Sequence, residues 1–437
     1  MDKHTARWSF LLVLALLISA CSSTPATPAS SSNPTVAATP NEPTKSTDSK
    51  TTITVWDYYG EATPIKPLIA GFENEYPNIT VQYEALDWNT TLEKLNVVLT
   101  GGTPPDVVTI DMTWLPKFAA LGAFTDLRTL SKQQMNGVAW DKAYTPGALD
   151  AISYNGQYVA ALYDFDVYAL YYRADLFKAK GLEPPKTWAE LTEVSKKLAE
   201  GDKYLYQWLP DTFHGSQWIF ENGGNLLGAD NKGVVFNSPE AIEAIQAYYN
   251  LLTQKSAIYW GPDQGERIQG LKDDRIAMFS DGPYNMGILK SAAPEMAGKW
   301  RVALHPYSKQ PGSYLGGTGL VIPAQSKQQD AAWKFIEYAM RLESQIGVYK
   351  YAGAAPALTA ALESPEVNVA DPYFDGQKTF DVFLEAMKTA KHFPYVRQWA
   401  DIDVAFTTAL QELGLGQKSV KDALDGAATI ANEALNK

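Results

Sequence analysis

Two short clusters of acidic and aromatic residues are the part of this sequence best suited to chemistry. Trp56, Asp57, Tyr58 and Tyr59 directly follow a mainly apolar run at 53–55, and Asp111 follows another at 107–110. Carboxylates accept hydrogen bonds from hydroxyl groups, and aromatic rings pack on flat C–H surfaces, so the combination suits a neutral polyol such as a sugar. Two carboxylates can also cleave a glycosidic bond at suitable separation, so glycoside hydrolysis stays open at this point.

The other common catalytic and metal-binding patterns are missing from the sequence. It contains no Gly-x-Ser-x-Gly, no His-Glu-x-x-His and no glycine-rich phosphate loop before Lys-Ser/Thr. Cys21 is the single cysteine, so no intramolecular disulfide can form, and the four histidines lie far apart in the sequence. We therefore expect no metal site and no cofactor.

The elements around the two clusters predict how they are positioned. Residues 53–56 and 79–83 read as strands, and the apolar residues between them recur with helical spacing over 65–76. A second helix over 92–99 and a buried strand over 107–110 follow. This β-α-β-α-β order predicts an α/β fold with a parallel sheet, in which ligands bind beyond the carboxyl ends of the strands. Both clusters lie at such ends.

Later segments predict further helices and strands of the same class. Thr187 and Glu190 have the spacing of a capping box at a helix start. Two strands are expected at 158–162 and 168–172, separated by residues 163–166. Two more are expected at 302–304 and 320–322, on either side of a glycine-rich turn. From residue 330 onward the pattern is mostly helical.

Length and composition indicate a folded, acidic protein. The chain has 437 residues, which suggests two or three domains. It contains 37 Lys and Arg against 49 Asp and Glu, a net charge of −12, which argues against nucleic-acid binding. With 12 Trp, 24 Tyr and 16 Phe, we expect some aromatic side chains to serve more than core packing.

The first 52 residues predict export and tethering. Lys3 and Arg7 precede nine apolar residues at 10–18, a run too short for a membrane span of about 20 residues and typical of a signal peptide. The residues before Cys21 resemble the lipobox of bacterial lipoproteins, in which removal of 1–20 leaves the cysteine to be acylated; a signal peptide with an incidental cysteine is the alternative. Residues 21–52 are rich in Ser, Thr, Pro and Ala, which predicts a disordered tether.

Seven short segments then follow one another in a recognisable order. They are GGTPPDVV at 101–108, LYYRADLF at 170–177, PPKTW at 184–188, ENGG at 221–224, AMFSDGP at 277–283, GGTGL at 316–320 and AAWKFI at 331–336. In this order, behind a lipobox, the chain from 53 to 437 resembles the family 1 extracellular solute-binding proteins of bacterial ABC importers, the group that includes maltose-binding protein.

The resemblance implies a periplasmic-binding-protein-like fold of type II, with two α/β lobes and a ligand cleft between them. Lobe one would comprise 53–163 and 307–355, and lobe two 166–305 and 356–437. Hinges are implied near 163–166, 305–306 and 353–356, where the chain would cross between the lobes.

The resemblance also implies a set of ligand-binding residues, which are Trp56, Asp57, Tyr58, Asp111, Trp114, Asp164, Asp166, Asp211, Phe213, His214, Trp218, Asp281, Tyr284, Gly316, Gly317, Arg397 and Trp399. Several have an alternative role. Asp164 and Asp166 also suit solvated hinge charges, and His214 also suits a surface or structural position. Trp56 and Trp218 also suit a core, and Asp111 also suits a helix cap. Asp281 also suits an Asx turn, and Arg397 can pair with an aspartate one helical turn on.

The implied function is capture of a carbohydrate by lobe closure and its delivery to a pair of permease subunits driven by a cytoplasmic ATPase. We expect a monomer without enzymatic activity, held by its lipid at the outer face of the cell membrane. Three alternatives remain, which are a non-sugar solute such as a polyol phosphate, a glycoside-active surface enzyme, and a sensor or adhesin without a permease. An anionic solute would need basic residues in the cleft, whereas the residues above are mostly acidic or aromatic.

Overall fold

The computed structural model describes residues 50–60, 63–260 and 264–436. The chain divides into two units, Met1–Asp48 and Ser49–Lys437, and all described residues belong to the second. The predicted signal peptide, Cys21 and almost all of the predicted tether lie outside the described residues, so they stay predictions. Every helix in the described part is too short or too polar to cross a bilayer.

The first of two sheets contains the strands of the expected β-α-β-α-β segment. Its order is β15-β8-β14-β3-β1-β2, with β16 paired to β14. The strands are β1 (Thr51–Asp57), β2 (Ile79–Ala85), β3 (Val107–Asp111), β8 (Ala161–Val167), β14 (Ser313–Val321), β15 (Ala355–Pro356) and β16 (Ala390–Lys391). Both β2 and β3 run parallel to β1, which confirms the parallel pairing expected from the sequence. The later strand β14 runs antiparallel to β3 and β8.

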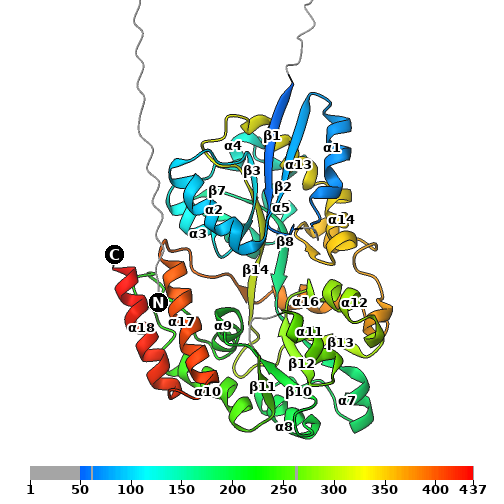
Figure 1. Ribbon diagram of the computed structural model, residues 1–437, viewed down its shortest axis with the longest axis vertical. Helices are drawn as coiled ribbons and strands as arrows, with labels where there is room; N and C mark the ends of the chain where they lie inside the picture. The colour runs from blue at the N-terminus through cyan, green and yellow to red at the C-terminus, as the bar shows by residue number, and fades with distance from the viewer. Residues whose placement is uncertain (1–49, 61–62, 261–263, 437) are drawn as a thin grey trace, which may run out of the picture. The chain divides into compact units, whose positions relative to one another are not determined.

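Short and medium helices accompany the first sheet, and Figure 1 shows them around β1, β2 and β3 in one lobe. They are α1 (Ile69–Glu75), α2 (Trp88–Gly101), α3 (Leu115–Ala120), α4 (Leu127–Leu130), α5 (Trp140–Ala143), α6 (Pro146–Ala151), α13 (Gln329–Ala339) and α14 (Leu342–Ala352). Two small hairpins join β4 (Gln134–Met135) to β5 (Val138–Ala139) and β6 (Ser153–Tyr154) to β7 (Gln157–Tyr158).

The second sheet has the order β11-β10-β12-β9-β13 and belongs to the other lobe (Figure 1). Its strands are β9 (Ala169–Arg173), β10 (Leu205–Trp208), β11 (Ala257–Tyr259), β12 (Ile276–Asp281) and β13 (Trp300–Ala303). The later helices are α7 (Ala174–Lys180), α8 (Trp188–Leu198), α9 (Thr212–Glu221), α10 (Pro239–Thr253), α11 (Gln264–Lys272), α12 (Asn285–Ala292), α15 (Thr359–Leu362), α16 (Thr379–Met387), α17 (Trp399–Gly414) and α18 (Val420–Leu435). At the start of α8, Thr187 and Glu190 form the predicted capping box.

Two clusters of buried apolar side chains hold these elements together. One surrounds the first sheet and extends to Tyr171, Phe279 and Trp300 of the second. The other lies among the second sheet and the helices α9, α10, α17 and α18. Because the larger cluster reaches both sheets, the two lobes share part of their apolar core.

Two expectations about strand continuity were wrong. Residues 163–166, expected as a break, lie within β8, because their backbone pairs with β14 on one side and with β15 on the other. The glycine-rich stretch 316–319, expected as a turn, lies within β14. At Gly317, φ is +129° and a Cβ atom would lie 2.2 Å from the Asp164 carbonyl oxygen, so glycine is needed here for close strand approach. The lobe and hinge boundaries stay predictions.

Candidate functional site

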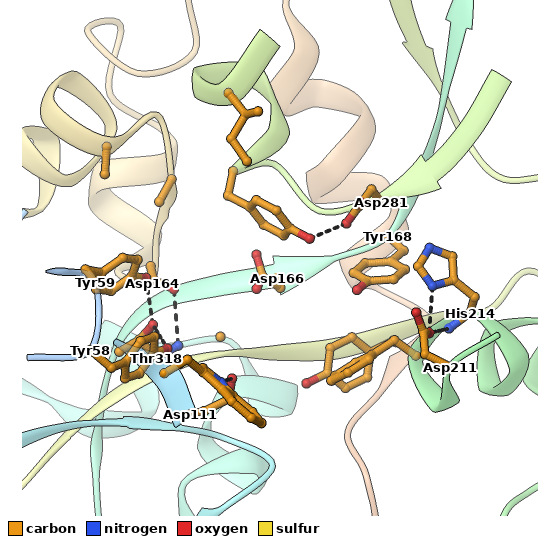
Figure 2. Close-up of a pocket in the computed structure, with 18 of the residues that line it drawn as sticks. Tyr58, Tyr59, Asp111, Asp164, Asp166, Tyr168, Asp211, His214, Asp281 and Thr318 are labelled. Atoms are coloured by element: carbon orange, nitrogen blue, oxygen red, sulfur yellow. Dashed lines mark hydrogen bonds and ion pairs between the residues drawn. The ribbon is translucent and has the colours of Figure 1, made fainter. Parts of the chain in front are cut away.

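A cavity of about 560 Å³ lies where β1, β3 and β12 end and where β8 and β14 pass each other (Figure 2). Helices complete its wall, since α2, α9, α11 and α12 each contribute side chains. The predicted site residues that line it are Tyr58, Asp111, Asp164, Asp166, Asp211, Phe213, His214, Asp281, Tyr284 and Gly317. The structure thus brings together residues from widely separated parts of the sequence, and ligand contact by each of them stays a prediction.

The structure places the other predicted residues outside the wall of this cavity; they are Trp56, Asp57, Trp114, Trp218, Gly316, Arg397 and Trp399. Trp218 and Trp399 are each 2% exposed and belong to the core of the second lobe. Trp218 stacks on Tyr248 with ring centroids 5.0 Å apart, and Trp399 lies 4.7 Å from Phe393. Their large apolar rings are therefore used for packing.

The remaining five occupy positions behind or away from the cavity. The buried Asp57 accepts hydrogen bonds from Thr63, Tyr83 and Thr109, which stabilises the end of β1. The Trp56 ring lies under the Lys94 ammonium, and Trp114 packs behind Tyr58 and Trp88. Gly316 faces the Tyr314 ring, and Arg397 is exposed.

A hydrogen-bonded group of four side chains forms one side of the cavity (Figure 2). The Tyr58 and Tyr59 hydroxyls each lie 2.7 Å from the Thr318 hydroxyl. The Tyr59 hydroxyl also donates to Asp164, which in addition accepts from the Thr318 backbone N–H. Burial raises the pKa of Asp164 to about 7, although these hydrogen bonds favour its ionised form. The group holds the Tyr58 and Tyr59 rings in place, stacked with centroids 5.0 Å apart.

Trp88 and Asp111 form an aromatic and acidic pair beside this group. The Trp88 indole N–H donates to Asp111 at 3.0 Å, and its ring lies 4.7 Å from that of Trp114. The other Asp111 oxygen accepts from the backbone and hydroxyl of Thr113, as in an Asx turn. Burial raises the pKa of Asp111. The indole of Trp88 remains 39% exposed, unusually high for tryptophan, and can cover a ligand ring.

On the opposite side, His214 is held in its cationic form. Its Nδ1 lies 2.7 Å from an Asp211 carboxylate oxygen and its Nε2 lies 2.9 Å from the Ser280 carbonyl oxygen. Both partners are acceptors, so both ring nitrogens must donate, which requires an imidazolium. Burial lowers the pKa of His214, but the charge and hydrogen bond of Asp211 outweigh it and raise the pKa overall. Asp211 also caps α9, which fixes this pair at the helix start.

Asp281, at the end of β12, is fully engaged by protein groups. One oxygen accepts from the Tyr284 hydroxyl and the Gly282 N–H, and the other lies 2.8 Å from Arg267 Nη1. Arg267 is itself 3% exposed and lies 4.7 Å over the Phe279 ring. The cavity wall thus includes a basic side chain, whereas the sequence suggested mainly acidic and aromatic residues.

Further cavity residues were not among the predicted ligand-binding set, and they are Tyr59, Trp88, Tyr168, Leu209, Arg267, Ile288, Tyr314, Thr318, Ala352 and Ala354. Tyr59 belongs to the predicted strand-end cluster, and Thr318 lies within the glycine-rich segment. Trp88 follows the end of β2, so the rule that places ligands at strand ends also points to it. Arg267 carries no local signal, because only packing of α11 brings it to the cavity.

Comparison with known proteins agrees with this architecture. The family model described as bacterial extracellular solute-binding protein matches residues 57–346, more than half of the chain. The chain belongs to this family. The two-lobe α/β fold predicted from the sequence is confirmed by its similarity to solved structures of such proteins.

Three similar proteins illustrate the range of this solute-binding family. A binding protein of Brucella abortus (strain 2308) is 25% identical over 409 residues, which cover 88% of this chain and 93% of the relative. The diacetylchitobiose binding protein DasA of Streptomyces coelicolor is 25% identical over 74% of this chain and 75% of its own length. The structure of an ABC transporter solute binding protein of Thermotoga lettingae TMO bound with alpha-D-tagatose is 26% identical, has a TM-score of 0.75, and is matched over 88% of this chain and 100% of that one.

Proposed function

We propose that this solute-binding protein captures a carbohydrate outside the cell and delivers it to an ABC importer. The observation that carries the proposal is one cavity of about 560 Å³ in which carboxylates and aromatic rings from both lobes face the same space. Carboxylates accept hydrogen bonds from sugar hydroxyls, and aromatic rings cover sugar C–H faces. A volume in this range suits a mono- or oligosaccharide of a few rings. The relatives that bind diacetylchitobiose and tagatose support the same class of ligand.

Capture depends on contacts that come from both sides of the cavity. Tyr58 and Asp111 lie at the ends of β1 and β3 in the first sheet, whereas Asp281 and Tyr284 lie at the end of β12 in the second. A ligand that touches both sets favours the closed arrangement of the lobes, because only that arrangement allows all contacts at once. A micromolar dissociation constant corresponds to about −8 kcal/mol, which several hydroxyl hydrogen bonds and two or three ring contacts can supply.

The proposed location follows from the N-terminal sequence. Cleavage after residue 20 would leave Cys21 to carry lipid, and residues 21–52 would link the folded part to the outer face of the cell membrane. The closed, loaded monomer would then dock on the permease subunits of the importer. A Cys21→Ser variant should be found in the soluble fraction, or remain as an uncleaved precursor, without the mass of the lipid. Full membrane retention of a processed C21S chain would count against lipid anchoring.

The proposal includes no reaction, and a glycoside-active enzyme is the competing function. The cavity holds five aspartates, which is the residue type that glycosidases use. Incubation of the protein with oligosaccharides, followed by chromatography of the products, separates the two functions. Release of shorter sugars at catalytic turnover would replace binding by hydrolysis as the function.

The proposed function is tested by a thermal-shift screen against mono- and oligosaccharides, amino acids, polyamines and polyol phosphates. A ligand at 100 times its dissociation constant adds about 2.7 kcal/mol to the free energy of unfolding, which gives a clear rise in Tm. We expect the rise with a sugar, and we expect Tyr284→Ala to weaken it. Tyr351→Ala removes a tyrosine that is 64% exposed and outside the cavity wall, so it should leave the shift unchanged. A shift with a charged non-sugar alone would overturn the carbohydrate assignment.

A further inference from the structure

The five aspartates that line the cavity are not equally balanced by cations. Two of them are paired with the cationic side chains of Arg267 and His214. Among the described residues, no Lys, Arg or His forms an ion pair with the other three, which are Asp111, Asp164 and Asp166. When these three are ionised, the cavity wall carries three negative charges without a nearby positive partner. Such a wall attracts positive charge into the cavity.

Asp166 is the least satisfied of the three. The other two accept hydrogen bonds from neutral donors, whereas no described group donates one to the Asp166 carboxylate. Figure 2 shows Asp166 in the middle of the cavity, between the Tyr59–Asp164 group and the Tyr168–His214 group, without any marked interaction. On one side it is close to the backbone, since a Cβ atom at Gly282 would lie 2.9 Å from its Oδ1. Its free oxygens therefore face the space that a ligand would fill.

The walls around this carboxylate suit a cation as well as a sugar ring. Trp88, Tyr168 and Tyr314 line the same cavity, and the negative faces of such rings attract ammonium groups. A neutral ligand would remove water from Asp166 without supplying an opposite charge, which is unfavourable for a carboxylate. A ligand with a positively charged group next to Asp166 would supply both the charge and the hydrogen bonds that it lacks.

Arg267 points to a second feature of the ligand. Its Nη1 binds Asp281, but its Nε and Nη2 have no hydrogen-bond partner in the described structure although both are buried. The guanidinium charge is already balanced by Asp281, so the N–H groups of these two nitrogens suit neutral oxygens such as sugar hydroxyls. The cavity thus has one acceptor, Asp166, that lacks both a cation and a hydrogen-bond donor, and one donor group that lacks oxygen atoms.

We propose that the carbohydrate bound by this protein carries a free amine, with its ammonium group against Asp166 and its hydroxyl oxygens toward Arg267. The inference rests on the proposed function, since it names the kind of sugar that the same cavity takes. A polyamine would satisfy Asp166 and leave Arg267 without oxygen acceptors. A neutral sugar would do the reverse, so an amino sugar is the class of ligand that satisfies both side chains.

Calorimetric titration of the wild-type protein with three matched disaccharides tests the inference at pH 7. The β-1,4-linked disaccharides of glucosamine, N-acetylglucosamine and glucose share one skeleton, and only the first carries ammonium groups. We expect the glucosamine disaccharide to bind at least tenfold more tightly than either neutral one. Burial and the charges of neighbouring aspartates raise the pKa of Asp166. Titration in phosphate and in Tris buffer, which differ in heat of ionisation, therefore measures any change in bound protons that accompanies ammonium binding.

An Asp166→Asn variant removes the charge of this side chain but keeps its shape, so it tests which of the two the ligand recognises. It keeps the size and much of the hydrogen-bonding capacity of the side chain, so its affinity for the amino sugar should fall at least tenfold. Its affinity for the neutral sugars should rise, because loss of water costs an amide less than it costs a carboxylate. Asp202→Asn, at an exposed position, is the matched control and should change neither. Equal or tighter binding of a neutral disaccharide by the wild type overturns the inference and leaves the proposed function intact. Absence of binding by all three sugars also overturns the inference, whereas the proposed function fails only if no sugar in the thermal-shift screen binds.

Discussion

Replacement of Asp164 by asparagine should stabilise the ligand-free protein, and the gain should grow as pH rises. Asp164 is 2% exposed, and it accepts hydrogen bonds from Tyr59 and Thr318, both of which are neutral. Burial raises its pKa from 3.8 to about 7. Each pKa unit corresponds to about 1.4 kcal/mol, so a shift of about three units corresponds to about 4 kcal/mol at most.

The direction of the pH effect follows from where the proton is bound. Between pH 4 and pH 7 the folded state keeps the proton on Asp164, whereas the unfolded state releases it. This contribution to stability is therefore fully present below about pH 4 and is lost as pH rises through about 7. Asparagine does not titrate, and its amide can still accept from the Thr318 N–H and donate to the Tyr59 hydroxyl. Relative to wild type, the free energy of unfolding of the variant should rise by about 2 to 4 kcal/mol between pH 4 and pH 8.

Urea denaturation of both proteins at pH 4 and pH 8 measures this difference, and the comparison cancels the titration of the other buried groups. Asp202→Asn serves as the control, because this exposed side chain should change stability by less than about 0.5 kcal/mol at either pH. A gain for Asp164→Asn that is the same at both pH values, or that is larger at pH 4, would refute the reasoning.

Three further predictions concern packing, ligand contact and capping. Gly317→Ala should lower Tm by several degrees, because the new Cβ would lie 2.2 Å from a backbone oxygen of β8. Gly101→Ala is the control and should leave Tm unchanged, since no atom outside the adjacent backbone lies within 4 Å of its new Cβ. Equal Tm values for the two variants would show that β14 can shift to make room. Trp88→Ala should weaken sugar binding about tenfold with little loss of stability, because the side chain is 39% exposed. Val97→Ala on the same helix, where the side chain is 68% exposed, should leave sugar affinity unchanged. Calorimetry that finds the same affinity for both variants would show that Trp88 does not contact the sugar. Thr187→Ala should lower the free energy of unfolding, measured by urea denaturation, by about 1 kcal/mol through loss of the cap on α8. Sugar affinity should not change, and a changed affinity would contradict a purely local role of the cap.

The elements and strand-end residues that depend on local patterns could be predicted from the sequence. The parallel strands β1, β2 and β3 follow from apolar periodicity, and their shared edge places Tyr58 and Asp111 in one cavity. The capping box at α8 could be predicted because it depends on two residues three positions apart. The signals that succeeded are thus those in which a few neighbouring residues decide the conformation.

The remaining features depend on contacts between distant segments. Trp218 and Trp399 were expected in the cleft, but a tryptophan suits a cleft and a core equally well, and here both rings lie in the core of the second lobe. Arg267 reaches the cavity only because β12 and α11 pack together, and its ion pair with Asp281 spans that contact. The glycines of β14 suggested a turn, since nothing in the sequence indicates how closely β8 approaches them.

The cavity wall combines two kinds of support, and this has a consequence for how the protein can change. Asp164, Asp166 and Gly317 stand on β8 and β14, whose backbones are paired with each other, so this part of the wall is held by the sheet itself. Trp88 and Arg267 stand on the separate helices α2 and α11. Single replacements on these helices can therefore change the ligand preference, in nature or in the laboratory, while β8 and β14 stay the same. The protein could therefore be adapted as a sensor for another ligand by changing residues on the helices, while the paired strands β8 and β14 are kept.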